Sequence, residues 1–208
     1  MSKKKPILII AAEPFSVFSE ILFKTFKKHK LKNHLVVIAS FRLLKTQMKF
    51  LKYKIPLNMI DKNFEIKDKK IKSLNIINVD LIFSKPFKKI SKMSNLYNTR
   101  SFQLALNIIK SNNFVGLING PISKKYFLKN DTPGMTEFIA KKTKTQKFAM
   151  LIYNKKLAVS PITTHIPIKK VSKIISKKKI IDHVKLINKF YKKNFNQKPR
   201  IAITGLNP

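Results

Sequence analysis

The chain contains no cysteine and only four glycines among its 208 residues. The lack of cysteine excludes disulfides, thiolate metal sites and a cysteine nucleophile, so any metal ion would need His, Asp or Glu ligands. The glycine-rich motifs GxGxxG and GxxxxGK[ST] are also absent. A dinucleotide would therefore have to bind without the glycine-rich turn that follows the first strand of a Rossmann domain.

Long hydrophobic runs are missing as well. The apolar run at residues 7–12 is shorter than a signal-peptide core and is followed at once by Glu13 and Pro14. No stretch approaches the roughly 20 apolar residues that span a bilayer. Hydrophobic residues nevertheless make up 44% of the chain, enough to fill a core. We therefore expect a cytoplasmic protein that does not associate with membranes.

Acidic residues are scarce, since 9 Asp and Glu face 45 Lys and Arg, for a net charge of +36. Such an excess can indicate nucleic-acid binding. Only Arg42, Arg100 and Arg200 carry the guanidinium fork that favours phosphate and base recognition, and the lysines are spread along the whole chain. We favour solvated lysine faces on an enzyme over specific nucleic-acid binding, with a field that attracts small phosphorylated anions.

Short apolar runs alternate with helical periodicity, which predicts an α/β fold. The runs predict strands, and the 3.6-residue periods predict helices. Expected strands are 7–12, 35–39, 74–77, 79–83, a buried strand at 115–118, a hairpin of 148–153 with 157–160, and 200–204; expected helices are 17–28, 41–52, 99–110, 136–144 and two within 168–194 that meet near Ser176.

Three segments have residues suited to chemistry. After the strand at 115–118, Gly120 would let the backbone approach a ligand and Lys124 could pair with an anion, although a plain turn fits equally well. Thr136 could cap the helix that follows and bind an anion there, or simply cap it. His165 lies between hydroxyl residues and a proline, as a metal ligand, a general base or a structural histidine. The other three histidines, His29, His34 and His183, are expected at the surface.

In this order, the segments GPISK, TPGMTEF, TTHIPI and PRIAITGLNP resemble the 4-hydroxythreonine-4-phosphate dehydrogenase family of pyridoxal 5′-phosphate biosynthesis. The resemblance spans about residues 6 to 208. It implies a two-domain α/β fold like that of isocitrate and isopropylmalate dehydrogenases, which binds NAD or NADP without the Rossmann fingerprint. The expected domains are residues 1–120, normally completed by a carboxyl-terminal segment, and residues 121–208.

The resemblance also implies roles for single residues. Thr136 corresponds to a substrate-binding residue, Met135 stands where the family has a substrate-binding histidine, and Lys124 is our candidate for a substrate anion contact. His165 corresponds to the first of three histidines that hold a divalent metal such as Zn, Mg, Mn or Co. The second follows a Leu-Asn-Pro like residues 206–208, so we expect a carboxyl-terminally incomplete fold that is inactive alone.

The amino-terminal loop departs from the family, which reads Gly-Glu-Pro-Ala-Gly-Ile-Gly-Pro-Glu where this chain reads AEPFSVFSE at residues 12–20. Glu13, Pro14 and Glu20 remain, but Phe15 and Phe18 replace small residues and would change how closely a ligand approaches the backbone.

The activity that the resemblance implies is NAD-dependent, metal-dependent oxidation and decarboxylation of 4-(phosphooxy)-L-threonine to 3-amino-2-oxopropyl phosphate by a homodimer. The alternative is a degenerate, non-catalytic paralogue or basic binding module that retains the fold. Met135 and the lost glycines favour this alternative, whereas His165 and Thr136 favour the enzyme.

Overall fold

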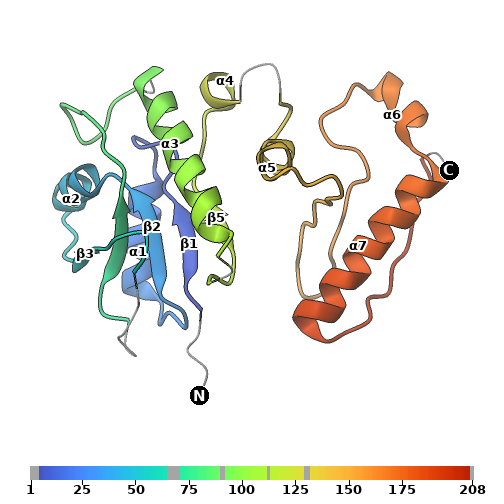
Figure 1. Ribbon diagram of the computed structural model, residues 1–208, viewed down its shortest axis with the longest axis horizontal. Helices are drawn as coiled ribbons and strands as arrows, with labels where there is room; N and C mark the ends of the chain where they lie inside the picture. Colours follow the sequence, from blue (N-terminus) through green and yellow to red (C-terminus); the bar gives the residue numbers. More distant parts are fainter. Residues whose placement is uncertain (1–4, 65–70, 90–91, 112, 129–131, 207–208) are drawn as a thin grey trace. The chain divides into compact units, whose positions relative to one another are not determined.

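A computed structural model describes residues 5–64, 71–89, 92–111, 113–128 and 132–206. The chain divides into two compact units, Met1–Lys129 and Asn130–Pro208, and each is described by itself (Figure 1).

The first unit is built on a five-stranded parallel sheet with the order β3-β4-β2-β1-β5. Within the register, Ile9 of β1 lies opposite Val37 of β2 and Ile118 of β5. The strands are β1 (Ile7–Ile10), β2 (Leu35–Ala39), β3 (Leu57–Met59), β4 (Leu74–Asn78) and β5 (Leu117–Asn119).

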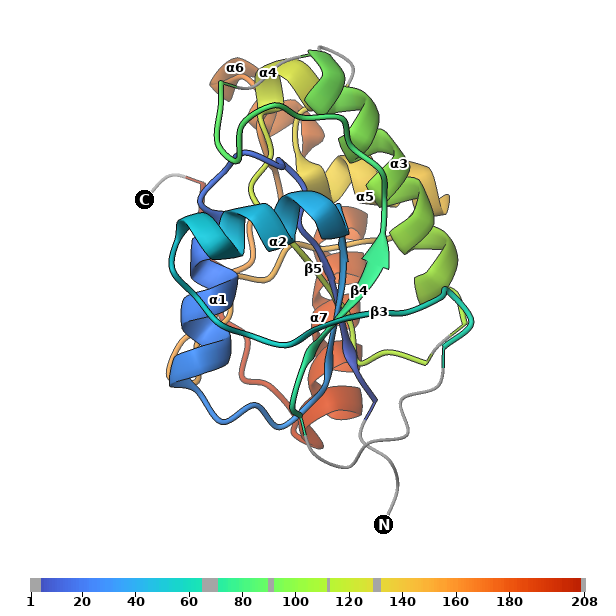
Figure 2. The ribbon, with the colours of Figure 1, turned by 90° about the vertical axis from the view of Figure 1, so that its left-hand side faces the viewer.

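Helices cover both faces of this sheet (Figure 2). The helices α1 (Phe18–Lys28) and α2 (Phe41–Phe50) lie on one face, and α3 (Lys92–Ile109) lies on the other. Because successive strand side chains point to opposite faces, Ile9 packs with Phe23 of α1 in one core cluster while its buried neighbours Leu8 and Ile10 face the other way. Both faces of the central strands are therefore apolar, as in parallel sheets generally.

The second unit has little buried surface of its own. It comprises α5 (Met135–Thr143), α6 (Ile168–Ile174), α7 (Lys177–Phe195) and an isolated antiparallel bridge between Ile152 and Val159. Among its described residues, only Gly134 and Ala140 are buried. Aromatic contacts supply part of the packing, since the Tyr153 ring stacks on Phe195 with centroids 5.1 Å apart.

Most of the predicted elements are confirmed. The strand at 35–39 has the expected bounds, and Ser176 caps α7 by accepting a hydrogen bond from the Lys179 amide at 3.2 Å. The expected hairpin reduces to the single bridge noted above. Residues 200–204 pair with no strand among the described residues, and Ile203 is 59% exposed.

Three other expectations in the first unit are wrong. The segment 79–83 is not a strand, because the chain leaves the sheet after the Val79 amide donates to the Ala39 carbonyl. The strand at 115–118 is not buried: β5 forms an edge of the described sheet and Ile118 is 52% exposed. Helix α3 begins at Lys92 rather than near 99. The apolar spacing did not predict its first two turns, because buried positions there, such as Ser94 and Asn98, are polar.

The division between the units falls after residue 129, where we expected it after residue 120. The short helix α4 (Lys124–Phe127) belongs to the first unit because Phe127 stacks on Phe102 of α3, with ring centroids 5.1 Å apart.

Candidate functional site

The loops that follow β1 and β5 meet at the carboxyl end of the parallel sheet. The Gly120 amide donates to the Ile10 carbonyl at 2.8 Å, and the Glu13 amide donates to the Pro121 carbonyl at 2.9 Å. A Cβ at Gly120 would lie 2.5 Å from the Ala11 carbonyl oxygen, so only glycine fits there without a shift of the backbone. β2 lies on one side of β1 and β5 on the other, so the loops after β1 and β5 stand at the point where the strand order changes direction. Ligands of open α/β sheets bind at such a point.

The first of these loops buries a carboxyl group. Glu13 is 3% exposed, and its Oε2 accepts a hydrogen bond from the Asn98 side chain at 3.3 Å, while Oε1 has no partner among the described residues. Burial raises the pKa of Glu13, and hydrogen bonds from Ser94 and Asn98 partly oppose that rise. Burial raises the pKa of the nearby Tyr97 hydroxyl to about 12, so this group stays neutral beside Glu13.

The loss of glycine from this loop is visible in its backbone. Ala12, which stands where the resembled family has glycine, adopts a left-handed conformation with φ 57°. Such a conformation costs a residue with a Cβ about 1–2 kcal/mol. Phe15 is buried and Phe18 is half-buried, so both rings occupy the space that smaller residues would leave open.

Lys124, the candidate anion contact, is exposed at the first position of α4. It lies in the first unit, whereas Met135, Thr136 and His165 all lie in the second. The last three residues are therefore described together, and Lys124 with the first unit.

Helix α5 presents Met135 and Thr136 in its first turn. The residue at the N-cap is Gly134, in an extended conformation, and its carbonyl accepts from the Phe138 amide at 3.0 Å. The expectation that Thr136 caps this helix is therefore wrong, because Thr136 is the second helical residue. Both Met135 and Thr136 are half-buried.

The loop with His165 comes close to this helix start. A Cβ at Gly134 would lie 3.1 Å from His165 Cδ2, 3.4 Å from His165 Nε2 and 2.8 Å from Glu137 Oε2. The Thr164 hydroxyl donates a hydrogen bond to Glu137 Oε1 at 2.5 Å. The structure thus places the His165 ring close to Gly134, the residue that precedes α5.

Glu137 is the residue of this cluster that sequence reasoning missed. It lies within the quoted segment TPGMTEF and is the acidic residue in the first turn of α5. An acidic residue near a helix N-terminus usually indicates only a favourable interaction with the helix dipole. The signal was therefore present but carried no sign of the contact with Thr164.

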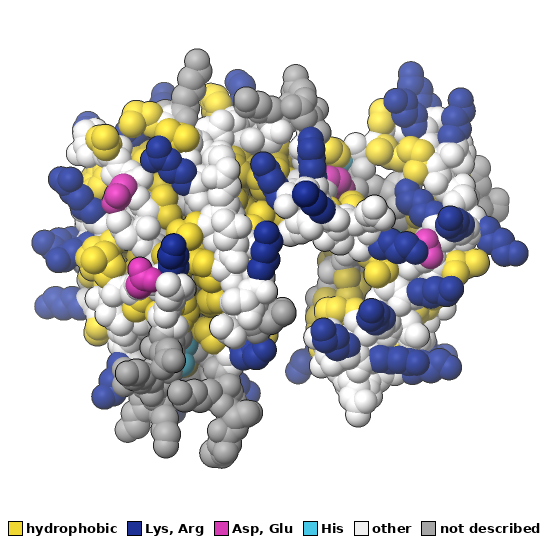
Figure 3. Space-filling model, viewed as in Figure 1, with side chains coloured by type: hydrophobic (Ala, Val, Ile, Leu, Met, Phe, Trp, Pro, Cys, Tyr) yellow, Lys and Arg dark blue, Asp and Glu magenta, His cyan; other side chains and the backbone are white. Residues whose placement is uncertain are grey.

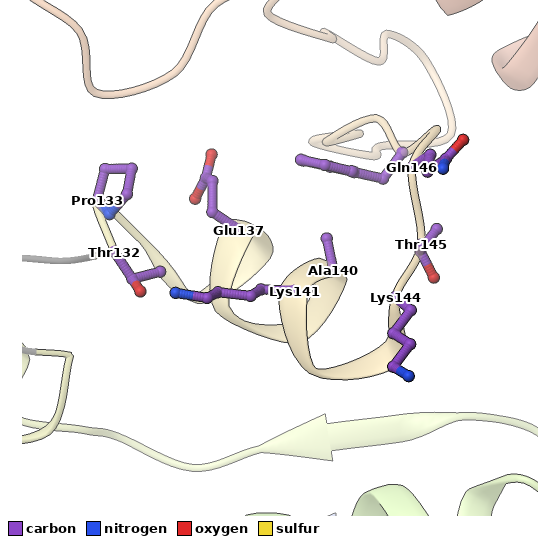
Figure 4. A pocket seen from close by; sticks show the side chains of 9 residues that line it. Thr132, Pro133, Glu137, Ala140, Lys141, Lys144, Thr145 and Gln146 are labelled. Carbon is purple, nitrogen blue, oxygen red and sulfur yellow. The ribbon is translucent and has the colours of Figure 1, made fainter.

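A cavity of about 550 Å³ opens beside the same helix (Figure 4). The side chains of Glu137 and Ala140 point from the same side of α5, Lys141 lies on the helix between its ends, and Lys144 follows its last residue. The cavity shares Glu137 with the His165 cluster. Its lining residues are Thr132, Pro133, Glu137, Ala140, Lys141, Lys144, Thr145, Gln146 and Phe148.

His183 is not the plain surface residue that we expected. It is half-buried, and its Nε2 lies 2.7 Å from the Ser160 hydroxyl, which in turn donates to the Met150 carbonyl. Burial and the nearby Lys179 charge lower its pKa. His183 therefore ties α7 to the bridge region as a neutral structural residue.

Comparison with known proteins decides the family. The profile of the family described as "Pyridoxal phosphate biosynthetic protein PdxA" matches residues 31–208. The chain belongs to this family. Its relatives include the 4-hydroxythreonine-4-phosphate dehydrogenase of Sulfurihydrogenibium sp. (strain YO3AOP1), 32% identical with 97% of this chain covered, and that of Aquifex aeolicus (strain VF5), 31% identical with 98% covered.

Solved structures of PdxA-family proteins share the fold. That of 4-hydroxythreonine-4-phosphate dehydrogenase from Klebsiella pneumoniae has a TM-score of 0.83 at 23% identity, and covers 99% of this chain and 65% of its own. The corresponding structure from Burkholderia phymatum has a TM-score of 0.82 at 20% identity, and covers 100% of this chain and 64% of its own. The chain spans 63% of the length of the two curated relatives named above. The α/β fold with a parallel sheet is thus confirmed.

The metal that the PdxA resemblance implies is not matched by the described residues alone. Within the described ranges, no group of three His, Asp or Glu side chains is placed to hold a metal ion. The His165 ring and the Glu137 carboxyl both lie close to Gly134, which is fewer than the three protein ligands that a catalytic zinc usually has. We therefore derive no reaction step through a metal.

Charge and helix composition bear on the remaining partners. Lys and Arg side chains are scattered over the visible face, with no single stripe of the kind that tracks a nucleic-acid backbone (Figure 3). In the parts of the chain that the structure describes, no helix has both the length and the apolar character to cross a bilayer.

Proposed function

We propose that this chain takes part in the NAD-dependent oxidation and decarboxylation of 4-(phosphooxy)-L-threonine to 3-amino-2-oxopropyl phosphate. The observation that supports the proposal is the approach of His165 to Gly134, beside Met135 and Thr136 at the start of α5. These are the positions to which the resemblance assigns the substrate and the first metal histidine.

In this reaction the carbon that bears the hydroxyl group loses a hydride to the nicotinamide, and the hydroxyl oxygen loses its proton. The product is a β-keto acid, which releases carbon dioxide to give 3-amino-2-oxopropyl phosphate. The Thr136 hydroxyl and the free amides of the first turn of α5 bind and orient the polar substrate, since a helix N-terminus favours anionic groups. Lys124 is the proposed cationic contact for the substrate phosphate.

His165 is proposed as one of several ligands of a divalent Zn, Mg, Mn or Co ion, with the remaining ligands outside the described residues. A bound ion would supply Lewis acidity toward the substrate hydroxyl. We further propose that the active form is a homodimer, that it accepts NAD or NADP, and that it acts in the cytoplasm, where nicotinamide cofactors and phosphorylated intermediates are available.

The alternative is a non-catalytic member of the family that retains the fold. Met135 in place of the family's histidine favours it, and so does Ala12 in a left-handed conformation where the family has glycine. In that case both changes, in the substrate-binding loop and in the amino-terminal loop, would contribute to the loss of activity.

The test is NADH formation, followed by absorbance, with 4-(phosphooxy)-L-threonine and either NAD or NADP. Because the chain spans 63% of its relatives' length, we expect little activity from the 208 residues alone. We expect activity when the chain is extended by the segment that the Aquifex aeolicus relative has beyond the matched region. A chelator, or His165→Ala in the extended chain, should abolish it.

The control for the extended chain is His29→Ala, which changes an exposed histidine in the first unit. An extended, folded chain that binds the substrate but forms no NADH would support the non-catalytic alternative. Full activity that survives His165→Ala would overturn the assignment of this residue.

A further inference from the structure

The carboxyl group of Glu137 connects the loop of His165 to the start of α5. Its Oε1 accepts the hydrogen bond of the Thr164 hydroxyl, so the residue next to His165 is tied to the first turn of the helix. Its Oε2 is buried and has no hydrogen-bond partner among the described residues. A buried carboxyl oxygen without a partner is unfavourable, because it has lost its hydrogen bonds to water.

The backbone at His165 is strained in the same place. Its φ of 48° lies in the left-handed region, which is unfavourable for a residue with a Cβ. Strain of this kind persists only where neighbouring contacts hold it. Thr164 supplies one such contact, and the close approach of the imidazole to Gly134 supplies another.

Gly134 leaves room for both groups. The position of its absent Cβ lies 2.8 Å from Glu137 Oε2 and 3.1 Å from His165 Cδ2, so any side chain there would displace either the carboxyl or the ring. The Glu137 carboxyl and the ring of His165, an exposed residue, therefore both lie against Gly134.

From these contacts we propose that Glu137 is a positioning residue, which acts through Thr164 to fix the imidazole of His165 over Gly134 and beside Met135 and Thr136. The catalytic meaning of that placement rests on the function proposed above; the placement itself does not. Glu137 touches the loop and not the reacting atoms.

The test uses the full chain labelled with ¹⁵N-histidine, which has only four histidines and so gives a readable spectrum. The decisive signal is the nuclear Overhauser effect between the His165 ring Hδ2 and the Gly134 Hα protons. We expect this effect in the wild-type chain and its loss in Glu137→Ala and in Thr164→Val, because each removes one side of the same hydrogen bond. The signals of His29 and His34, in the first unit, should not move.

Glu137→Gln separates positioning from a general effect of charge on the helix. The amide oxygen of Gln can still accept from Thr164, so the ring contact should be retained although the negative charge is lost. If Glu137 served only to stabilise the helix through its charge, Gln and Ala would have the same effect. The double variant Glu137→Ala with Thr164→Val should be no worse than either single variant.

Retention of the ring contact in Thr164→Val would overturn the proposal, and so would its loss in Glu137→Gln. Should Glu137→Ala unfold the second unit, Thr164→Val still decides the question because it leaves the carboxyl in place. Failure of the NADH assay with an intact ring contact would reject the proposed function and leave this inference standing.

Discussion

The sharpest test of the first unit is a pair of identical substitutions at the two ends of β5. Gly120→Ala would place a Cβ 2.5 Å from the Ala11 carbonyl oxygen and 2.8 Å from Phe18 Cδ2, well inside the 3.4 Å at which ordinary contact begins. Gly116→Ala would place a Cβ with nothing within 4 Å. Neither glycine has a positive φ, so the backbone itself tolerates alanine at both positions.

The two variants should therefore change stability in opposite directions. At Gly116 the substitution gains about 0.4–1 kcal/mol, since alanine reduces the entropy of the unfolded chain. At Gly120 the same gain is outweighed by a clash that moves the loops after β1 and β5 apart, at a cost of about 1–3 kcal/mol. The difference between the two estimates is a net loss at Gly120 of up to about 2.6 kcal/mol.

Urea unfolding followed by far-ultraviolet circular dichroism measures this difference, and exchange of the residue 120 amide, which donates to the Ile10 carbonyl, assigns it to the first unit. The Ile10 carbonyl accepts the Gly120 amide, so neighbouring exchange should accelerate in Gly120→Ala and not in Gly116→Ala. Equal unfolding midpoints for the two variants would refute the close packing of β5 against the loop after β1.

Two further predictions concern the same unit. Glu13→Gln should flatten the pH dependence of stability. Burial raises the pKa of Glu13 in the folded chain above the ordinary 4.5, so the unfolded chain loses this proton first. The free energy of unfolding of the natural chain therefore falls as pH rises from 4.5 to the folded pKa. Urea titrations across that window measure it, and parallel slopes for the two chains would contradict the burial of this carboxyl. Phe23→Ala should cost about 3–5 kcal/mol because the ring is fully buried, whereas Phe50→Ala, at a ring 64% exposed, should cost far less; comparable losses in thermal unfolding would show that the core is misplaced.

The sheet was predictable where the physics is local. Residues 35–39 form a run of apolar, mostly β-branched side chains, and a central parallel strand buried on both faces favours that composition. Residues 79–83 are also mostly apolar, yet they leave the sheet because the two strands that flank β4 end first: β2 ends opposite Asn78 and β3 ends opposite Ile76. Sequence periodicity does not contain that information, since it depends on where the partner strands end.

The candidate site was predictable in its residues and not in its contacts. The order of the motifs places Met135, Thr136 and His165 in one family pattern, and in the structure the His165 ring lies close to Gly134, which precedes α5. The predicted role of Thr136 as the helix cap was wrong because the N-cap is Gly134, two residues earlier, and Thr136 already lies within the helix. Glu137 was missed because its partner, Thr164, is 27 residues away in the sequence.

The scarcity of buried side chains in the second unit implies an uneven energy landscape. Its amides should exchange with solvent and its loops should be cut by proteases well before the parallel sheet opens, because local opening is governed by how much apolar surface each region sequesters. Thr136 and His165 belong to this readily opened half. A molecule that binds only the folded second unit would therefore stabilise that unit. At concentrations well above its dissociation constant, the gain in stability would grow with the logarithm of the concentration.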